Sequence, residues 1–366
     1  MMEVEEKYMA RCIQLARSGA GHTRPNPMVG AVVVADGRII GEGFHRKGGG
    51  PHAEVNAIAA VKKEKLLENS TLYVSLEPCS HWGKTPPCAS LILEKKIPRV
   101  VVGCLDPFPE VSGRGVQLLR AAGVEVVTGV LEKEAWELNK AFMTLQTEKR
   151  PYIILKWAQS ADGFIDRIRR DVSESPVRLS SAAAGRRVHK LRSEVGAIMV
   201  GTRTALLDNP SLTVREWAGP SPLRITIDRE GRIPASYHLL DGSVPTLIFT
   251  ASEAFSDREN LHSIRADFNR SLLPQVLDEL AARKIDSLLV EGGTELLTHF
   301  LEAGLWDEAR VETAPVYLER GVKAPQVAGR PGAAVTESIP LDFALRSSGA
   351  GPRLARWITI YSRRNL

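Results

Sequence analysis

The sequence predicts an α/β protein made of two domains, and three observations lead to this prediction. Short apolar runs rich in β-branched residues alternate along the chain with segments whose apolar residues have helical spacing. At 366 residues, the chain is long for a single hydrophobic core. The charged stretch 149–151, which ends in Pro151, separates two such alternating series. We therefore expect one domain at residues 1–148 and a second at 149–366.

In the first domain, local signals mark several element boundaries. Asp36-Gly37 is a hairpin signal between two strands, and Pro51 suits the first turn of a helix. Strands are expected at 31–34, 38–41, 71–76, 99–103 and 124–127, and helices at 8–17, 51–61, 88–94, 116–122 and 132–148. This alternation indicates a layered fold with ligands at strand ends and helix starts.

The second domain is richer in predicted strands. Strands are expected at 152–155, 197–201, 224–228, 246–250, 287–290 and about 354–361, and helices at 181–193, 272–283 and 295–301. The polar stretch 250–269 is expected to be surface, as are the basic cluster 167–170 and Arg363.

Composition limits the classes of function and partner. A charged fraction of 25% and a hydrophobic fraction of 43% are ordinary for a globular protein. A net charge of +5 permits an anionic ligand but does not require nucleic acid, which we do not expect as a partner. The first residues lack an apolar signal core, and no apolar run reaches the roughly 18 residues of a membrane helix. Four scattered cysteines fit a reducing compartment, so we expect a cytoplasmic protein without a membrane partner.

The combination of His52, Cys79 and Cys88 predicts a catalytic zinc site. One imidazole and two thiolates can hold zinc and leave a fourth position for water. Glu54, which need not be a ligand, can then move the proton of that water. A His-x-Glu triplet followed by Pro-Cys and a second cysteine is the signature of zinc-dependent deaminases. A lone triplet of this kind is usually only a helix start, but all the parts occur here in order. Both His52 and Glu54 can reach a point beyond a helix N-terminus, where the helix dipole favours thiolates.

Two features of the second domain point to a cofactor site. Glu291-Gly-Gly-Thr294 follows an apolar strand and opens a helix, so that backbone N–H groups could approach a phosphate. Alone, this turn is weak evidence, because Gly-Gly after a strand is often only a tight turn. A polar segment at 201–215 also follows a strand directly, and Lys156 and Ser160-Ala-Asp-Gly163 lie upstream of it.

Both sets of motifs resemble the bifunctional riboflavin-biosynthesis deaminase/reductase family. Eight residues, Ser80 to Pro87, separate the two cysteines, and this long gap resembles the family's deaminase half. The 201–215 segment, with Lys156 and 160–163, resembles its reductase half. The resemblance runs from about Tyr8 to at least Pro315. It implies a cytidine-deaminase-like three-layer domain followed by a dihydrofolate-reductase-like domain, with Zn²⁺ and NADPH as cofactors.

The same resemblance implies residue roles. His52, Cys79 and Cys88 match the zinc ligands, and Glu54 the proton shuttle. Further deaminase positions hold the ring and ribose phosphate of a phosphorylated pyrimidine; they are Asn26, His45, Lys84, Thr85 and Asp106. In the reductase half, the substrate side matches Lys156, Leu212, Arg215 and Glu291. The cofactor side matches Ala158, Thr204, Asp208, Gly292, Gly293 and Thr294.

Further expectations concern the reductase chemistry. Hydride from NADPH reaches C1′ of the ribosyl group, so a proton must reach the ring oxygen, and Lys156 is the candidate donor. Glu291 is expected to hold substrate hydroxyls or ring nitrogens. Arg178 stands where relatives often have a tryptophan that packs on the nicotinamide, so we expect Arg178 on the cofactor side. We also expect a homo-oligomer.

Two alternatives remain at this point. One is a nucleoside or tRNA-adenosine deaminase with an unrelated appendage, which a gap of two residues between the cysteines would favour. The other is a binding or regulatory protein with a decayed site. The intact His52, Glu54, Cys79 and Cys88 argue against it for the first half, whereas Arg178 leaves it open for the second.

Overall fold

The structure is a computed structural model that describes residues 2–80, 82, 86–108, 112–329, 333–340 and 356–363. The chain divides into two compact units, Met1–Arg150 and Pro151–Leu366. In the described residues, no helix has the length and apolar character needed to cross a bilayer.

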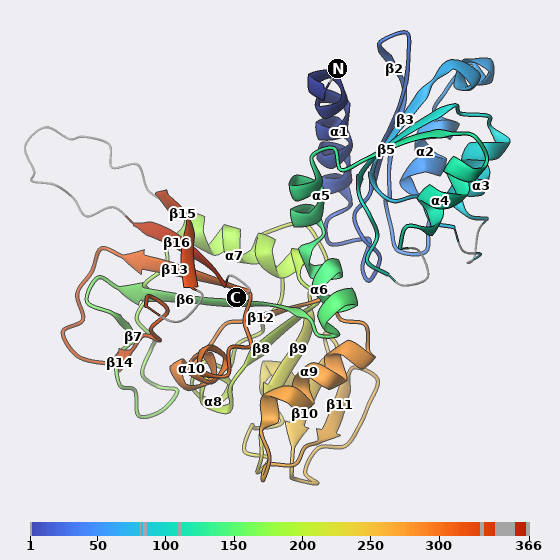
Figure 1. Ribbon diagram of the computed structural model, residues 1–366. Coiled ribbons are helices and arrows are strands. Elements are labelled where there is room, and N and C mark those ends of the chain that lie inside the picture. The colour runs from blue at the N-terminus through green and yellow to red at the C-terminus, as the bar shows by residue number, and fades with distance from the viewer. Residues whose placement is uncertain are drawn as a thin grey trace, which may run out of the picture. The chain divides into compact units, whose positions relative to one another are not determined.

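The strands described in the first unit form one five-stranded sheet in the order β2-β1-β3-β4-β5 (Figure 1). They are β1 (Gly30–Ala35), β2 (Arg38–Phe44), β3 (Thr71–Leu76), β4 (Arg99–Cys104) and β5 (Glu125–Thr128). The predicted hairpin is confirmed, with positive φ angles of 50° at Asp36 and 70° at Gly37. β3, β4 and β5 are parallel, and β1 is antiparallel to β3. The start of β1 and the ends of β2, β3 and β4 therefore meet at one edge of the sheet.

Helices cover both faces of this sheet, which gives three layers (Figure 1). One face packs against α1 (Met2–Ala16), α5 (Glu132–Leu138) and α6 (Lys140–Glu148). The other packs against α2 (Ala53–Ala59), α3 (Cys88–Glu94) and α4 (Arg114–Ala121). Neighbouring strand residues serve opposite faces, as Val32 and Val33 do. Two 3-10 turns, η1 (Arg17–Gly19) and η2 (Glu64–Asn69), lie between these elements.

In the described part of the second unit, nine strands form one sheet in the order β11-β10-β9-β8-β12-β6-β13-β16-β15. They are β6 (Tyr152–Ser160), β8 (Ala197–Val200), β9 (Leu223–Ile227), β10 (Thr246–Thr250), β11 (Leu261–Arg265), β12 (Ser287–Val290), β13 (Glu308–Ala314), β15 (Ala333–Pro340) and β16 (Trp357–Arg363). The run from β11 to β13 is parallel, and β16 and β15 add antiparallel pairs. β7 (Phe164–Asp166) and β14 (Val322–Lys323) form a small separate ladder.

Two cores lie on opposite faces of the nine-stranded sheet. One contains side chains of α9 (Leu272–Ala282) and α10 (Thr294–Glu302). The other contains side chains of α7 (Ala182–Glu194), α8 (Thr202–Asp208) and the turn η3 (His238–Leu240). β12 contributes alternately to the two faces, with Leu288 in one core and Leu289 in the other. The carboxyl ends of β6, β8 and β12 meet at one edge, where α8 and α10 begin.

Several predictions about elements need correction. The first helix begins near Met2 rather than at residue 8, and the expected helix 132–148 is interrupted at Asn139. The stretch 250–269 is exposed or half-buried over most of its length, as expected, but it also contains an unpredicted edge strand, β11. The final strand begins at Trp357 and reaches Arg363, whereas residues 354 and 355 lie outside the described part. Strands β7, β13, β14 and β15 and helix α8 were not predicted.

Candidate active sites

The predicted zinc-binding residues come together at the edge of the first sheet. His52 is the N-cap residue of α2, and Cys88 is the first residue of α3. Cys79 follows the end of β3 by three residues. The three ligand atoms all lie within 4.8 Å of one another, and no other cluster of this kind occurs in the described residues. The fold therefore collects three separate parts of the chain at one point.

The distances among these atoms suit a tetrahedral metal. His52 Nδ1 lies 3.5 Å from Cys79 Sγ and 3.3 Å from Cys88 Sγ. Ligands at about 2.0–2.3 Å from a tetrahedral zinc ion would be about 3.6 Å apart. The backbone N–H of Cys88 donates to Cys79 Sγ over 3.3 Å. A side-chain hydrogen bond with Cys88, more than any other contact, and a further one with His52 lower the pKa of the Cys79 thiol to about 4 despite its burial. A thiolate is the form that binds metal, so the donor set fits zinc.

Glu54 lies in the first turn of α2, beside the three ligands. Its side chain is buried, with 3% exposure, and burial is the main reason that its pKa is raised to about 7. A carboxyl group that titrates near neutral pH can both accept and donate a proton. The close approach of α2 to β2 fixes this position, because a Cβ atom at Gly43 would lie 2.3 Å from the backbone nitrogen of Ala57. Only glycine permits this packing.

The other predicted deaminase residues flank the same edge. His45, directly after β2, is buried at 3% exposure, and its ring centroid lies 5.5 Å from that of His52. His45 Nδ1 is 3.0 Å from Pro51 O, and Nε2 is 3.5 Å from Asn26 Nδ2. Burial lowers the pKa of His45, so its ring is neutral at pH 7. Asp106 follows β4 and is buried, and its Oδ1 accepts from the backbone N–H of Phe108. Lys84 and Thr85 lie outside the described residues.

Glu77, which the sequence analysis did not single out, organises the loop between β4 and α4. Its side chain is 4% exposed and follows β3 two residues before Cys79. Oε1 accepts from the backbone N–H groups of Gly115 (2.9 Å) and Val116 (3.2 Å). Oε2 accepts from those of Gly113 (2.9 Å) and Asp106 (3.3 Å). Glu77 thus ties Asp106 and the start of α4 to the strand that delivers a predicted zinc ligand.

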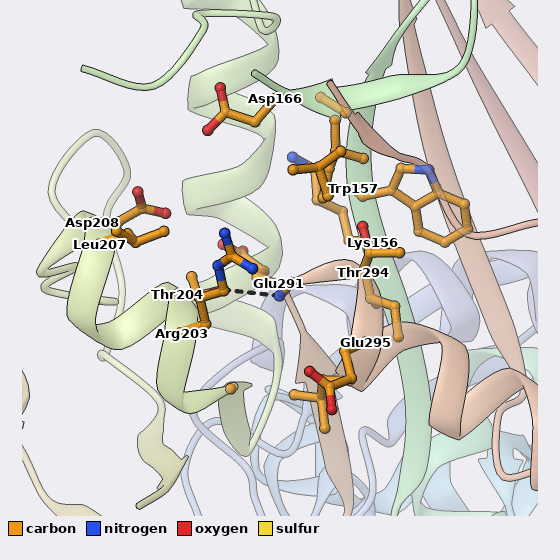
Figure 2. Close-up of a pocket in the computed structure, with 18 of the residues that line it drawn as sticks. Lys156, Trp157, Asp166, Arg203, Thr204, Leu207, Asp208, Glu291, Thr294 and Glu295 are labelled. Carbon is orange, nitrogen blue, oxygen red and sulfur yellow. Dashed lines mark hydrogen bonds between the residues drawn. The ribbon is translucent and has the colours of Figure 1, made fainter. Parts of the chain in front are cut away.

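A second candidate site lies in a cavity of about 1330 Å³ in the second unit. Figure 2 shows Lys156 and Trp157 on one side of it and Thr204, Leu207 and Asp208 on the other. The predicted reductase residues that line this cavity come from four places along the chain; they are Lys156, Ala158, Arg178, Thr204, Asp208, Glu291, Gly292, Gly293 and Thr294. β6, which carries Lys156, is flanked by β12 and β13, so Lys156 does not lie on an edge strand.

Glu291 is held at the cavity wall by an arginine that the sequence analysis missed. Arg192 of α7 donates to Glu291 through Nε (3.1 Å to Oε1) and Nη2 (2.6 Å to Oε2). Burial would raise the pKa of Glu291, but the charge of Arg192, with a smaller contribution from Lys156, lowers it. The carboxylate is therefore charged at neutral pH beside Lys156. Sequence gives no signal for Arg192 except its place on a predicted helix.

The predicted cofactor-side residues Thr204 and Asp208 each have a polar partner in the second unit. The backbone N–H of Gly293 donates to Thr204 Oγ1 over 2.9 Å, shown by the dashed line in Figure 2. Arg169 binds Asp208 (2.5 Å) and Asp166 (2.6 Å). Arg169 is only 8% exposed, so the prediction of a solvated cluster at 167–170 is wrong for this residue, although Arg167 and Arg170 are exposed. Its two acidic partners compensate its charge.

Two of the predicted reductase residues do not reach the cavity. Leu212 is buried in the core beneath α7, and Arg215 is exposed; neither lines the cavity. Their segment is linked to the site indirectly, since Arg192 Nη1 donates to Thr213 O over 3.2 Å. Arg178 lines the cavity and is exposed.

Comparison with known families matches both units. Residues 2–104 match the family described as the cytidine and deoxycytidylate deaminase zinc-binding region. Residues 151–334 match the family described as the RibD C-terminal domain.

Relatives match nearly the whole chain. Riboflavin biosynthesis protein RibD of Aquifex aeolicus is 41% identical over 327 residues, covering 87% of this chain and 89% of the relative. That of Bacillus amyloliquefaciens is 40% identical over 345 residues, covering 92% and 91%. A crystal structure from Thermotoga maritima superposes with a TM-score of 0.86 at 35% identity, covering 99% of both chains. It is described as a diaminohydroxyphosphoribosylaminopyrimidine deaminase/5-amino-6-(5-phosphoribosylamino)uracil reductase. RibD of Acinetobacter baumannii superposes with a TM-score of 0.84 at 32% identity, covering 99% of this chain and all of that one.

Proposed function

Because the chain belongs to the RibD family of bifunctional riboflavin biosynthesis proteins, we propose that the two sites described above catalyse that family's two reactions with the residues they bring together. The predicted fold class is confirmed: a cytidine-deaminase-like domain precedes a reductase domain of the dihydrofolate-reductase-like fold. The chain is a deaminase and reductase of the riboflavin pathway, with zinc and NADPH as cofactors. The matches over both units are inconsistent with an unrelated appendage and with a non-catalytic protein.

In the deaminase reaction, we assign the zinc-binding role to His52, Cys79 and Cys88. Zinc supplies Lewis-acid activation of a water molecule. Glu54 accepts a proton from that water and returns one to the departing amino group, so that the water oxygen replaces the amino group on the ring and the amino group leaves as ammonia. The substrate is the diaminopyrimidine carrying a ribosylamino phosphate, as named for the Thermotoga relative. Half-buried Asn26, which lies beside His45, and buried His45 and Asp106 are proposed to hold the ring and the ribose.

In the reductase reaction, Lys156 and Glu291 are assigned to the substrate side of the cavity. NADPH supplies a hydride to C1′ of the ribosyl group, and the C1′–O bond of the ring breaks. Lys156 donates a proton to the released ring oxygen, which gives the open ribityl chain. Glu291, charged and fixed by Arg192, accepts hydrogen bonds from substrate hydroxyl or N–H groups. Thr204, Asp208 and Gly292 to Thr294 are proposed to contact the cofactor from α8 and the start of α10.

The observation that supports this proposal most strongly is the convergence of His52, Cys79 and Cys88 next to buried Glu54. Two single variants, one in each unit, test the two sites, and both reactions are measured in each variant. Glu54→Gln is expected to retain zinc but to lose deamination by at least about 10² to 10⁴-fold, because it removes the general acid–base group. Lys156→Ala is expected to lower reduction at saturating NADPH by at least about tenfold.

Each variant serves as the control for the other, because the two changes lie in different units. The deaminated intermediate is supplied directly to measure reduction in Glu54→Gln, and deamination is measured without NADPH in Lys156→Ala. Each untouched activity should equal that of the unmodified protein. Near-normal deamination in Glu54→Gln would contradict the role of Glu54. Unchanged reduction in Lys156→Ala would make that lysine structural.

Two finer points are also proposals. We propose that the protein works in the cytoplasm. Its four cysteines form no disulfide, as is usual in a reducing compartment, and its second reaction consumes NADPH. The homo-oligomer remains a prediction, which light scattering of the purified protein would test. The phosphorylated pyrimidine is the expected small-molecule partner.

A further inference from the structure

A long loop borders the cavity of the second unit. Residues 167–181 join β7 to α7 and contain no helix or strand. Loops of more than about 12–15 residues without such elements are uncommon inside compact domains and are usually functional or disordered. We call residues 166–178 the strap. The strap residues that line the cavity are Asp166, Arg167, Arg169, Pro176, Val177 and Arg178.

Asp166 closes the strap on itself. Its Oδ1 accepts from the backbone N–H of Arg167 over 2.8 Å and from that of Val177, at the other end of the strap, over 2.9 Å. Its Oδ2 accepts from Arg169 Nε over 2.6 Å. The side chain of Arg169 is buried within this loop, whereas Arg167 and Arg170 are exposed. The strap therefore has a defined shape, with one arginine turned inwards.

Arg169 joins the strap to the end of α8. Nη2 donates to Asp208 Oδ1 over 2.5 Å, and Nη1 donates to Leu207 O over 3.3 Å and to Glu174 O over 3.4 Å. With the bond to Asp166, these contacts use most of the five guanidinium N–H groups, so Arg169 acts through the groups that it holds. Burial would lower the pKa of Arg169, but Asp208 and Asp166 raise it, so the guanidinium stays charged. The last carbonyl groups of a helix, such as that of Leu207, also favour a nearby cation.

The Asp208 carboxylate has one oxygen left for a ligand. Arg169 binds Oδ1, and Oδ2 has no hydrogen-bond partner in the described residues. The side chain of Asp208 is 32% exposed, and it lines the cavity on the side opposite Lys156 (Figure 2). Carboxylates are common acceptors for the ribose hydroxyl groups of nucleotide cofactors. Asp208 can therefore accept from the cofactor through Oδ2 while Arg169 holds Oδ1.

We propose that Arg169 is a positioning residue of the reductase, which latches the strap to the end of α8 and thereby shapes the part of the cavity that binds NADPH, with Asp208 turned towards a ribose hydroxyl of the cofactor. The proposal rests on the cofactor-side role proposed for Asp208. Arg169 also compensates the charge of Asp208, which would otherwise repel the phosphates of NADPH. The proposed substrate-side groups, Lys156 and Glu291, have no hydrogen bond or ion pair with Arg169 in the described residues, so the loss of Arg169 falls on cofactor binding.

The test measures reduction of the deaminated intermediate, followed by NADPH absorbance, in the full-length protein. Arg169→Lys keeps the charge, but a single ammonium group cannot bind Asp166, Asp208 and the carbonyl of Leu207 in this geometry. The variant is expected to raise the KM for NADPH by at least about tenfold, with the KM for the intermediate changed by less than about twofold. Deamination in the same protein should be unchanged.

Arg170→Lys is the matched control. Arg170 lies in the same loop, is exposed and does not line the cavity, and only its backbone N–H is hydrogen-bonded in the described residues. Both KM values should equal those of the unmodified protein. Hydrogen exchange of the Val177 N–H, which Asp166 accepts, should be faster in Arg169→Lys than in Arg170→Lys. Equal exchange in the two variants would show that the strap does not depend on Arg169, and would overturn the proposal.

The kinetic constants also separate positioning from a general loosening of the unit. An unchanged KM for NADPH in Arg169→Lys, or an equal rise in the KM for the intermediate, contradicts the proposal. Asp208→Asn tests the premise, because asparagine can still accept from Arg169 but loses the second acceptor oxygen. No change in the KM for NADPH in that variant refutes the cofactor-side role of Asp208. A rise there without one in Arg169→Lys refutes only the role of Arg169.

A double variant keeps the test decisive if Arg169→Lys does not fold. Arg169→Gln with Asp166→Asn removes the two most buried charges of the group and leaves Asp208, which is partly exposed, so no fully buried charge is left unpaired. The KM for NADPH should again rise by at least about tenfold, with the KM for the intermediate changed by less than about twofold. A KM for NADPH equal to that of the unmodified protein would show that the latch has no part in cofactor binding.

Discussion

The three predicted zinc-binding side chains each lie where a loop meets a helix or follows a strand. His52 and Cys88 are at helix starts, and Cys79 follows β3 after a short turn. Helix N-termini favour thiolate over thiol, which assists metal binding. The sequence indicated these residues because metal sites need particular side-chain types in a fixed order.

Loss of either cysteine is expected to remove zinc and deamination together. Cys79→Ala and Cys88→Ala each leave two protein ligands, which rarely retain zinc. Elemental analysis of the purified variants, with a deamination assay on the same samples, checks this. Cys12→Ala is the control, because Cys12 is a buried thiol in a core of the same unit. If both variants keep one zinc per chain, other ligands hold it, and the next candidates are His45 and His81, the latter outside the described residues.

Glu77 and Arg192 show what could not be predicted at this scale. Glu77 accepts from four backbone N–H groups, and every residue except proline offers such a donor. No side-chain pattern therefore marks its partners. Arg192 pairs with Glu291, which lies 99 positions away in sequence. Its partner depends on how α7 packs against the sheet.

At the scale of elements, the failures have local causes. Helix 132–148 breaks because buried Asn139 leaves the helical conformation to bind the backbone of Met28, with its Oδ1 accepting from Met28 N and its Nδ2 donating to Met28 O. β13 was missed because Glu308 and Glu312 occupy buried positions in it. Glu312 is compensated by Ser180 (2.6 Å) and Arg356 (3.0 Å). The partners of Glu312 come from distant parts of the chain, so the sequence of β13 itself lacks the apolar alternation that marks a strand.

The loop between β4 and α4 is expected to loosen when Glu77 is changed. In Glu77→Gln, the amide NH₂ group cannot accept, so the two backbone N–H groups that donate to the replaced oxygen lose this partner, at a cost of about 1–3 kcal/mol each. Hydrogen exchange at Gly113, Gly115 and Val116 should become faster, deamination should fall, and reduction should be unchanged. Glu64→Gln, an exposed residue paired with Lys95, is the control. Exchange as slow as in the unmodified protein would refute this role.

At the scale of the whole molecule, the division into two units could be predicted because each half of the sequence has its own series of alternating strands and helices. Each unit has its own sheet, with core clusters on both faces. The order of strands in the nine-stranded sheet could not be predicted, since β6 pairs with β12 and β13, more than 120 residues later in the chain. That pairing places Lys156 beside Glu291.

Separating the units should leave both activities. Cleavage between Glu148 and Pro151 is expected to give an N-terminal fragment that deaminates and a C-terminal fragment that reduces supplied intermediate, because each unit buries its own core. Expression of the two fragments, with circular dichroism and both assays, checks this. Insoluble or inactive fragments would indicate a shared core and a wrong boundary. An uncut chain carrying the same terminal tags is the control.

The central claim is that one chain performs deamination and then reduction. The most direct measurement follows product mass after the purified, zinc-loaded protein is mixed with the phosphorylated diaminopyrimidine. Without NADPH, the product should have exchanged one amino group for oxygen and gained no hydrogen. When NADPH is added, that product should gain two hydrogens, one of them deuterium when the cofactor is deuterated at its hydride position. A substrate that keeps its amino group, or a deaminated product that never gains hydrogen, would contradict the claim.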